Sequence, residues 1–191
     1  MENAAKSEKY KERREKLEKS FEKYIPLLDK KVESISPSGN YKLIMISYDT
    51  GEGFWNFTKG VIYNKSEEEI FTIYRNYHIF PFQWIEHQNG NEYLLCGEDY
   101  QGYVTLNLTE KKKHVYFSDE GFKGWGFCWV EIKEWDQDYD DNLIVNGCCW
   151  GGQFEIVEYD FSNPDELPYK EVSRRDVVYD DDDDDDSNKQ I

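Results

Sequence analysis

Short runs of β-branched and aromatic residues recur through the centre of the chain, and clusters of turn-forming residues separate them. The runs are YKLIMISY, KGVIYN, EEIFTIYR, EYLLCGE, GYVTLNLT, KHVYFSD, FCWVEI, NLIVNG and QFEIVEYDF, and the turn clusters include SPSGN, QNGNE and DYDDN. Because short strands at regular spacing are typical of all-β architectures, the pattern predicts an all-β domain over residues 36–172, built as a sandwich, a barrel or a propeller-type repeat.

The first 35 residues follow a helical period instead. Between residues 5 and 28 the apolar side chains keep to one narrow stripe, formed by Tyr10, Leu17, Phe21, Tyr24 and Leu28. The stripe predicts a charged amphipathic helix, which Pro26 should kink or end. Two interpretations stay open. The helix docks on the β domain through Phe21, Ile25 and Leu28, or it forms a short coiled coil with a partner or a second copy.

An internal repeat organises the β region. Residues 92–108 align with residues 142–158 at an offset of fifty positions without a gap. Each copy reads apolar strand, Gly, two variable residues, an aromatic residue, one residue, Gly and an alternating strand. The matched pairs are Gly97 with Gly147, Tyr100 with Trp150, and Gly102 with Gly152.

The segments around these copies repeat as well. FQWIEH resembles FCWVEI upstream of each copy, and EEEIFTIYRN resembles KKKHVYFSDE as a closing strand. A weaker third copy begins at SPSGNYKLIMISYD and continues at KGVIYN after an insertion, DTGEGFWNFT. The repeat therefore predicts about three units of four short antiparallel strands, each in about 45 to 50 residues.

This unit resembles a blade of a β-propeller of the WD-repeat or kelch type. The segment FCWVEI…NGCCW…FEIVEYDFSNPDELPYKE also resembles the C-terminal region of uncharacterised proteins with this repeat pattern. The resemblance implies a fold rather than an activity. Since propellers typically close with four to eight blades, three units imply an open half-propeller, a pairing of two copies, or strands that curl into a sandwich or barrel.

Charge narrows the range of partners. The formal net charge is −17, and residues 36–170 carry 10 basic against 23 acidic side chains. A domain this acidic repels phosphate backbones, so we expect no direct binding of nucleic acid. The tail, residues 173–191, contains seven consecutive aspartates at 180–186 and is expected to be disordered. It either keeps the protein soluble or engages a basic protein partner.

The apolar content indicates an intracellular protein. The chain starts without the apolar stretch of a secretory signal, and no apolar run approaches the length of a membrane span. We therefore expect a cytoplasmic or nuclear location, no membrane contact and reduced cysteines.

Motifs for cofactor, metal or catalytic chemistry are weak. Cys148 and Cys149 are adjacent, whereas zinc-binding pairs need intervening residues, and Glu98 and Asp99 replace them in the other copy. DQDYDDN lacks the Gly and the bidentate Glu of a calcium loop. We therefore predict no metal site, no cofactor and no catalytic residues.

The remaining candidates are aromatic and acidic residues in the loops between strands. The glycine-flanked insertion GEGFWNFTKG places several aromatic side chains where a partner could reach them. The candidate partner- or ligand-binding residues are Phe54, Trp55, Phe57, Glu98, Asp99, Tyr100 and Trp150.

These observations favour a non-enzymatic protein-interaction or scaffolding protein, in which the loops between strands contact a protein partner. It could also form a homodimer through the N-terminal helix or an open sheet edge. The alternative is a hydrolase, or a small-molecule-binding protein that holds a sugar or a cation, with acidic and aromatic loop residues at the site.

Overall fold

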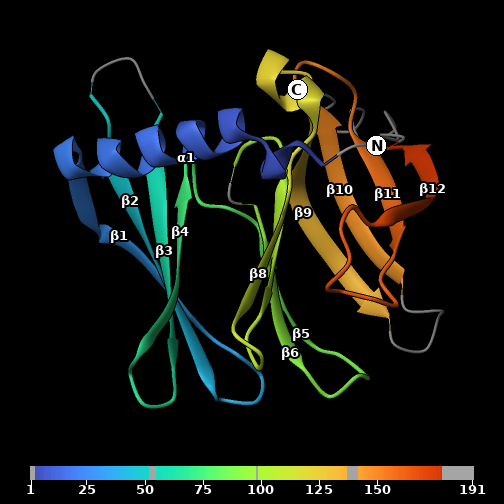
Figure 1. Cartoon of the computed structure of the whole chain (residues 1–191), viewed down its shortest axis with the longest axis horizontal. Coiled ribbons are helices and arrows are strands. Elements are labelled where there is room, and N and C mark those ends of the chain that lie inside the picture. Colours follow the sequence, from blue (N-terminus) through green and yellow to red (C-terminus); the bar gives the residue numbers. More distant parts are fainter. Residues whose placement is uncertain (1–2, 52–54, 98, 137–141, 178–191) are drawn as a thin grey trace, which may run out of the picture.

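The structure is a computed structural model that describes residues 3–51, 55–97, 99–136 and 142–177. Twelve strands form three four-stranded antiparallel sheets, and each sheet is a meander of four consecutive strands (Figure 1). The first sheet contains β1 Ile25–Ile35, β2 Tyr41–Asp49, β3 Phe57–Asn64 and β4 Glu69–Arg75. The middle sheet contains β5 Phe82–Glu86, β6 Glu92–Cys96, β7 Tyr103–Asn107 and β8 Lys112–Tyr116. The last sheet contains β9 Phe127–Asp136, β10 Asn142–Cys149, β11 Glu155–Asp160 and β12 Lys170–Asp176.

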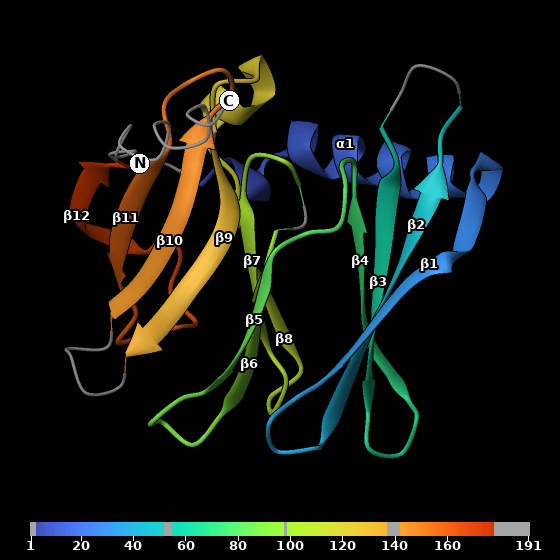
Figure 2. The ribbon, with the colours of Figure 1, turned by 180° about the vertical axis from the view of Figure 1, so that it is seen from behind.

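The sheets lie side by side in chain order (Figure 2). Two clusters of buried hydrophobic side chains join them. One cluster combines Leu43 and Ile62 of the first sheet with Leu94 and Val104 of the middle sheet. The other combines Tyr103 of the middle sheet with residues of the last sheet, among them Trp129, Leu143, Val145 and Val157. Each sheet therefore owes its buried area to a neighbouring sheet, as blades do when they stack.

The middle sheet is buried on both faces. Along β6, Leu94 joins the cluster shared with the first sheet, while Tyr93 and Leu95 join the cluster shared with the last. Successive residues of a strand point to opposite faces, so alternate positions serve different interfaces. This explains why β6 and β7 read as nearly continuous apolar runs.

The repeat unit expected from the sequence is confirmed as a four-stranded antiparallel sheet. The aligned segments become the second and third strands of the middle and last sheets. The first glycine of each aligned copy, Gly97 after β6 and Gly147 within β10, sits where a side chain does not fit. A Cβ on Gly97 would lie 2.2 Å from Arg75 Nη1, and a Cβ on Gly147 would lie 2.3 Å from the backbone oxygen of Cys128. The ladder between β9 and β10 also shifts register at Gly147, which indicates a β-bulge.

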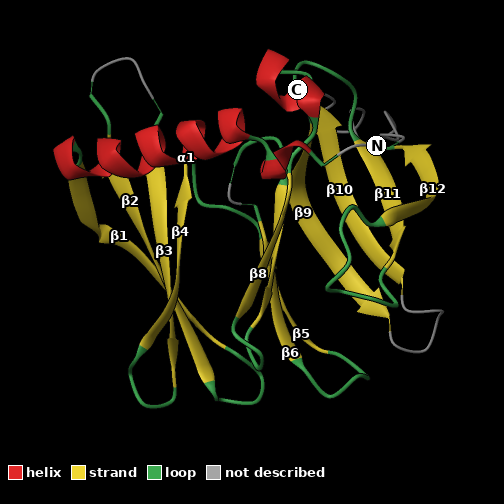
Figure 3. Cartoon of the chain, viewed as in Figure 1, coloured by secondary structure: helices red, strands yellow, loops and turns green. Residues whose placement is uncertain are grey.

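The helix expected over residues 5–28 is shorter than the apolar stripe. Two short 3₁₀ turns, η1 Ala4–Lys6 and η2 Phe21–Lys23, flank helix α1, which runs over Glu8–Ser20 (Figure 3). Ser7 begins the helix by accepting a hydrogen bond from Tyr10 N. The chain then turns into β1, where residues 25–27 and 32–35 pair with β2, so a ladder of tertiary hydrogen bonds replaces the local helical period. As a consequence Ile25 and Leu28 are exposed and do not dock a helix, which corrects that expectation.

The tail begins later than expected. Residues 173–176, assigned to the tail by their charge, belong to β12 at the edge of the last sheet, and every residue of β12 is exposed. Charged side chains suit such an edge, because they oppose pairing with another chain. The aspartate run, residues 180–186, lies outside the described residues.

Helix α1 lies across one end of the first sheet and reaches the middle sheet (Figures 1 and 2). Tyr10 packs on Phe117, which follows β8, and Phe21 contacts three rings of the first sheet, Tyr48, Phe57 and Tyr74. Docking through Phe21 therefore agrees with the sequence. None of the helices in the described ranges has the length and apolar composition needed to cross a membrane.

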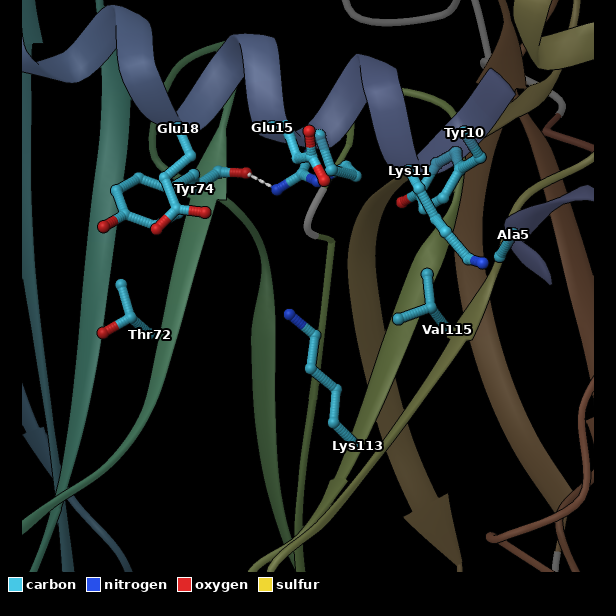
Figure 4. Close-up of a pocket in the computed structure, with 10 residues that line it drawn as sticks. Ala5, Tyr10, Lys11, Glu15, Glu18, Thr72, Tyr74, Lys113 and Val115 are labelled. Carbon is cyan, nitrogen blue, oxygen red and sulfur yellow. Dashed lines mark hydrogen bonds between the residues drawn. The ribbon is translucent and has the colours of Figure 1, made fainter. Parts of the chain in front are cut away.

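A cavity of about 430 Å³ remains beneath α1, between the edge strands β4 and β8. Figure 4 shows Lys11, Glu15 and Glu18 pointing from the helix into it, while Lys113 approaches from β8. One hydrogen bond crosses the gap, from Arg14 to the backbone oxygen of Tyr74. Since the lining mixes both charges, this cavity is suited to water rather than to an apolar ligand.

Candidate functional site

Loops from all three sheets meet at the end of the molecule that carries α1. Each loop joins the second and third strand of its sheet, and each supplies one aromatic side chain: Trp55, Tyr100 or Trp150. The ring centroids of Trp150 lie 6.5 Å from those of Trp55 and 5.6 Å from those of Tyr100. Tyr77, between β4 and β5, completes the group at 5.2 Å from Trp55 and 4.7 Å from Tyr100. We call these four residues the aromatic patch.

Asn76 fixes the relative position of two patch residues. Its backbone oxygen accepts a hydrogen bond of 3.0 Å from Trp55 Nε1, and its side-chain oxygen accepts one of 3.2 Å from the backbone N–H of Tyr100. The rings meet mostly edge to face, an arrangement that the aromatic quadrupole favours. These contacts hold the rings of the patch in a fixed arrangement.

The patch nevertheless remains open to solvent. Trp55 is 46% exposed and Trp150 is 53% exposed. A cavity of about 250 Å³ lies among the four rings, and Arg13 and Gln101 also line it. Because large apolar rings are costly to leave in water, this exposed group is a candidate functional site.

A buried carboxylate anchors α1 next to the patch. Asp99 is 2% exposed, and its two oxygens accept hydrogen bonds from Arg13 Nε at 3.0 Å and Arg13 Nη2 at 3.2 Å. Arg14 Nη1 lies 3.8 Å away, and the backbone N–H of Tyr100 donates to the same carboxylate at 2.8 Å. Asp99 therefore ties the helix to the loop that carries Tyr100, and its charge is neutralised within the chain.

A second guanidinium lies deeper. Arg75, the last residue of β4, is buried and donates to the backbone oxygens of Gly97 at 3.0 Å and Asp99 at 3.3 Å. Burial lowers the pKa of Arg75 from its usual value, while the neighbouring Asp99 opposes that shift. Arg75 thus supports the backbone of the Tyr100 loop from inside the protein.

The candidate residues from the sequence separate into groups. The structure brings three of them together: Trp55, Tyr100 and Trp150. In the sequence, only their positions in equivalent loops connected them. Phe57 lies elsewhere, with its ring 5.4 Å from Tyr24 and 6.1 Å from Phe21, and helps to dock the N-terminal segment. Phe54 and Glu98 lie outside the described residues.

Sequence reasoning missed Asn76, Tyr77, Gln101 and Arg13. Arg13 belongs to a helix whose charges looked like a solvated face, and the other three belong to connections without a recognisable motif. Their roles depend on contacts between distant parts of the chain, such as the 86 positions that separate Arg13 from Asp99.

The adjacent cysteines end β10 and do not point to one ligand. Cys148 is buried and Cys149 is half-buried, and all four cysteines are free thiols. Burial raises the pKa of both Cys148 and Cys149, and it raises the pKa of Cys128 to about 11. Within the described ranges, no group of three or more His, Cys, Asp or Glu side chains is arranged to hold a metal ion.

These pKa shifts predict slow alkylation of the folded protein. Only the thiolate reacts. At a pH below the raised pKa of the folded protein, the fraction of thiol present as thiolate is smaller than in an unperturbed cysteine. At about pH 8, the thiolate fraction of Cys128 should be about a hundredfold lower than that of an unperturbed thiol, and exposure should make Cys149 react first. Timed iodoacetamide labelling followed by peptide mass spectrometry measures the order, with urea-unfolded protein as the control. Equal rates for Cys128 in the folded and unfolded chain would contradict it.

Comparison with known proteins gives one informative match. No protein-family model and no solved structure matches the sequence. An uncharacterized protein of Acanthamoeba polyphaga mimivirus is 36% identical over 142 residues, which are 72% of this chain and 55% of the viral protein. The chain therefore spans about half the length of that relative.

Proposed function

We propose that this protein is a non-enzymatic binding protein whose aromatic patch contacts a protein partner. The observation that carries the proposal is the convergence of Trp55, Tyr100 and Trp150 from equivalent loops of three sheets. The sheets act as propeller-like blades whose function is to hold these loops in a fixed arrangement. Binding surfaces on rigid scaffolds are commonly built from loops in this way.

The composition of the site favours protein binding. Trp, Tyr and Arg are the residues most enriched among those that dominate the energy of protein interfaces. The patch combines two Trp and two Tyr with Arg13 at its side. Because these rings already pack on one another and Asn76 holds Trp55 and the backbone of Tyr100, less conformational entropy is lost when a partner binds.

The geometry weighs against the alternatives. A hydrolase with paired carboxylates would need a free acidic side chain, but Asp99 is neutralised by Arg13 and closed to solvent. A cation site would need a free carboxylate at the patch, but the one described carboxylate beside it, Asp99, is already occupied by Arg13. We therefore retain the protein-interaction function.

The test is affinity capture with single patch variants. Trp150→Ala and Trp55→Ala should each weaken retention of a specific protein partner from cell extract by at least about tenfold, because truncating a central aromatic residue of an interface typically costs about 2 kcal/mol or more in binding free energy. The matched control is Leu28→Ala, which removes an exposed apolar side chain on β1 away from the patch. Identical partner lists for the patch variants and the control would refute the proposed function.

A further inference from the structure

A second cavity adjoins the aromatic patch. It measures about 380 Å³ and lies between the middle and last sheets. Its walls are aromatic: the rings of Trp129 and Tyr169 stack on Tyr103 at centroid distances of 4.2 Å and 5.3 Å, within 12° of parallel. Trp125 also lines this cavity and is 62% exposed.

Gln101 lies at the junction of the two cavities and lines both. The residue is 7% exposed, and its side-chain amide makes no hydrogen bond to any part of the chain that the structure describes. Glycines leave room around it, since a Cβ on Gly124 would lie 4.0 Å from Gln101 Nε2 and one on Gly126 would lie 3.0 Å from Gln101 Cβ.

The polar atoms of the Gln101 amide are not enclosed by the protein and remain accessible at the walls of the two cavities. A side chain that carries both a donor and an acceptor is therefore available to a ligand that offers the complementary pair. The backbone peptide unit of another chain offers one N–H and one C=O in that arrangement.

We infer that the partner of the aromatic patch binds as an extended peptide segment, with a backbone amide on Gln101 and one large apolar side chain in each cavity. This inference rests on the proposed function and specifies the chemistry of the partner. Successive side chains of an extended chain point to opposite sides, which suits two cavities on either side of one amide. Extended segments recognised through backbone bonds and side-chain pockets are a recurrent binding mode.

Charge supports apolar rather than ionic anchors. The guanidinium at the patch, Arg13, is paired with Asp99, and the one at the second cavity, Arg174, is held by Glu155 and Glu171 at 2.7 Å each. Both guanidinium groups are therefore already neutralised and are not available to an acidic side chain of a ligand, while Lys170 and Glu120 are the other charged residues that line the second cavity. The aromatic walls instead favour Trp, Phe, Leu or Pro side chains.

The experiment uses a panel of N-acetylated, C-amidated linear decapeptides of Gly, Ser and Ala. Each carries two anchors chosen from Trp, Phe, Leu and Pro, separated by zero to three positions, and single-anchor peptides serve for comparison. Fluorescence anisotropy of labelled peptides measures binding to the full chain. We expect at least one two-anchor spacing to bind at least about tenfold more tightly than either single-anchor peptide.

The decisive variant is Gln101→Met, which keeps the length of the side chain and removes both hydrogen-bonding groups. It should weaken peptide binding about tenfold. The melting temperature should stay equal or rise, because no hydrogen bond of the free protein is lost. The matched control, Gln83→Met, alters a side chain of β5 that donates to Trp84 O and should leave peptide binding unchanged.

Three results would overturn the inference. One is that no two-anchor peptide binds although Trp150→Ala still abolishes partner capture. That result would refute the peptide mode and leave the proposed protein-binding function in place. Another is that Gln101→Met and Gln83→Met bind peptides equally well. The third is that neutral oligosaccharides bind in a Trp150-dependent manner and peptides do not, which would make the ligand a sugar.

Discussion

Replacing Asp99 with alanine is expected to lower the free energy of unfolding by about 3 kcal/mol, since removal of one partner of a buried ion pair leaves the other uncompensated. In this variant Arg13 and Arg14 lose their carboxylate, and the backbone N–H of Tyr100 loses an acceptor. We place the loss at the lower end of the usual range because the side chain of Arg13 is partly exposed. Urea unfolding followed by circular dichroism measures the change.

The control for Asp99 is the exposed pair formed by Glu8 and Lys11 on the same helix, whose charged atoms lie 3.3 Å apart. Glu8→Ala should change the unfolding free energy by no more than about 0.5 kcal/mol, because solvent screens exposed ion pairs. Asp99→Asn, which keeps the shape and one acceptor, should fall between the two. Equal losses for Asp99→Ala and Glu8→Ala would show that α1 does not depend on this carboxylate.

Replacing Trp129 with alanine is expected to cost about 4 kcal/mol, the cost typical of removing a large buried aromatic side chain. Trp129 is buried and lies parallel to Tyr103 at 4.2 Å, in the cluster that joins the middle and last sheets. Its removal leaves a cavity that neighbours on two different sheets cannot fill without separating from their own sheets. Thermal unfolding by calorimetry should show the loss as a lower melting temperature.

Trp125 is the matched control, because it lies three residues before β9 starts its buried stretch and is mostly exposed. Trp125→Ala should stay within about 0.5 kcal/mol of the original chain, as substitutions on the surface usually do. A loss of similar size in both variants would mean that burial between the sheets is not what makes Trp129 important.

The fold could be predicted wherever the relevant pattern was local. The offset of fifty residues placed Gly97 on Gly147, and both occupy positions where a Cβ would collide, with the Arg75 side chain at Gly97 and with the backbone of β9 at Gly147. Alternation and turn clusters located the strands of the middle sheet, because each pairs with its neighbour in sequence. In a meander each strand pairs with the next strand along the chain, so a pattern read locally also identifies the pairing partner.

The ends of the fold could not be predicted in the same way. The helical stripe over residues 5–28 extended into the first residues of β1, and only pairing with β2 decided the conformation of that segment. At the other end, β12 was classified by its charge as part of the tail, although charge is compatible with an edge strand. In both segments, pairing with another strand decided the conformation, and the local residue pattern did not.

The candidate site was partly predictable for a related reason. Tyr100 and Trp150 were matched by the repeat, so a shared role followed once the sheets were side by side. The convergence with Trp55, by contrast, depends on how the first sheet packs against the other two. Gln101 carried no sequence signal. What singles it out is a side-chain amide that makes no hydrogen bond within the described chain, and no sequence pattern marks such an amide.

The link between Arg13 and Asp99 also orders events in time. Every sheet is assembled from strands that follow one another along the chain, whereas this ion pair closes a loop of 86 positions. A contact between distant residues requires closing a long loop, which costs conformational entropy, so we expect it to form after the local contacts. We therefore expect α1 to dock last during folding and to leave first during unfolding, so that the helix reports on whether the middle sheet beneath it is complete.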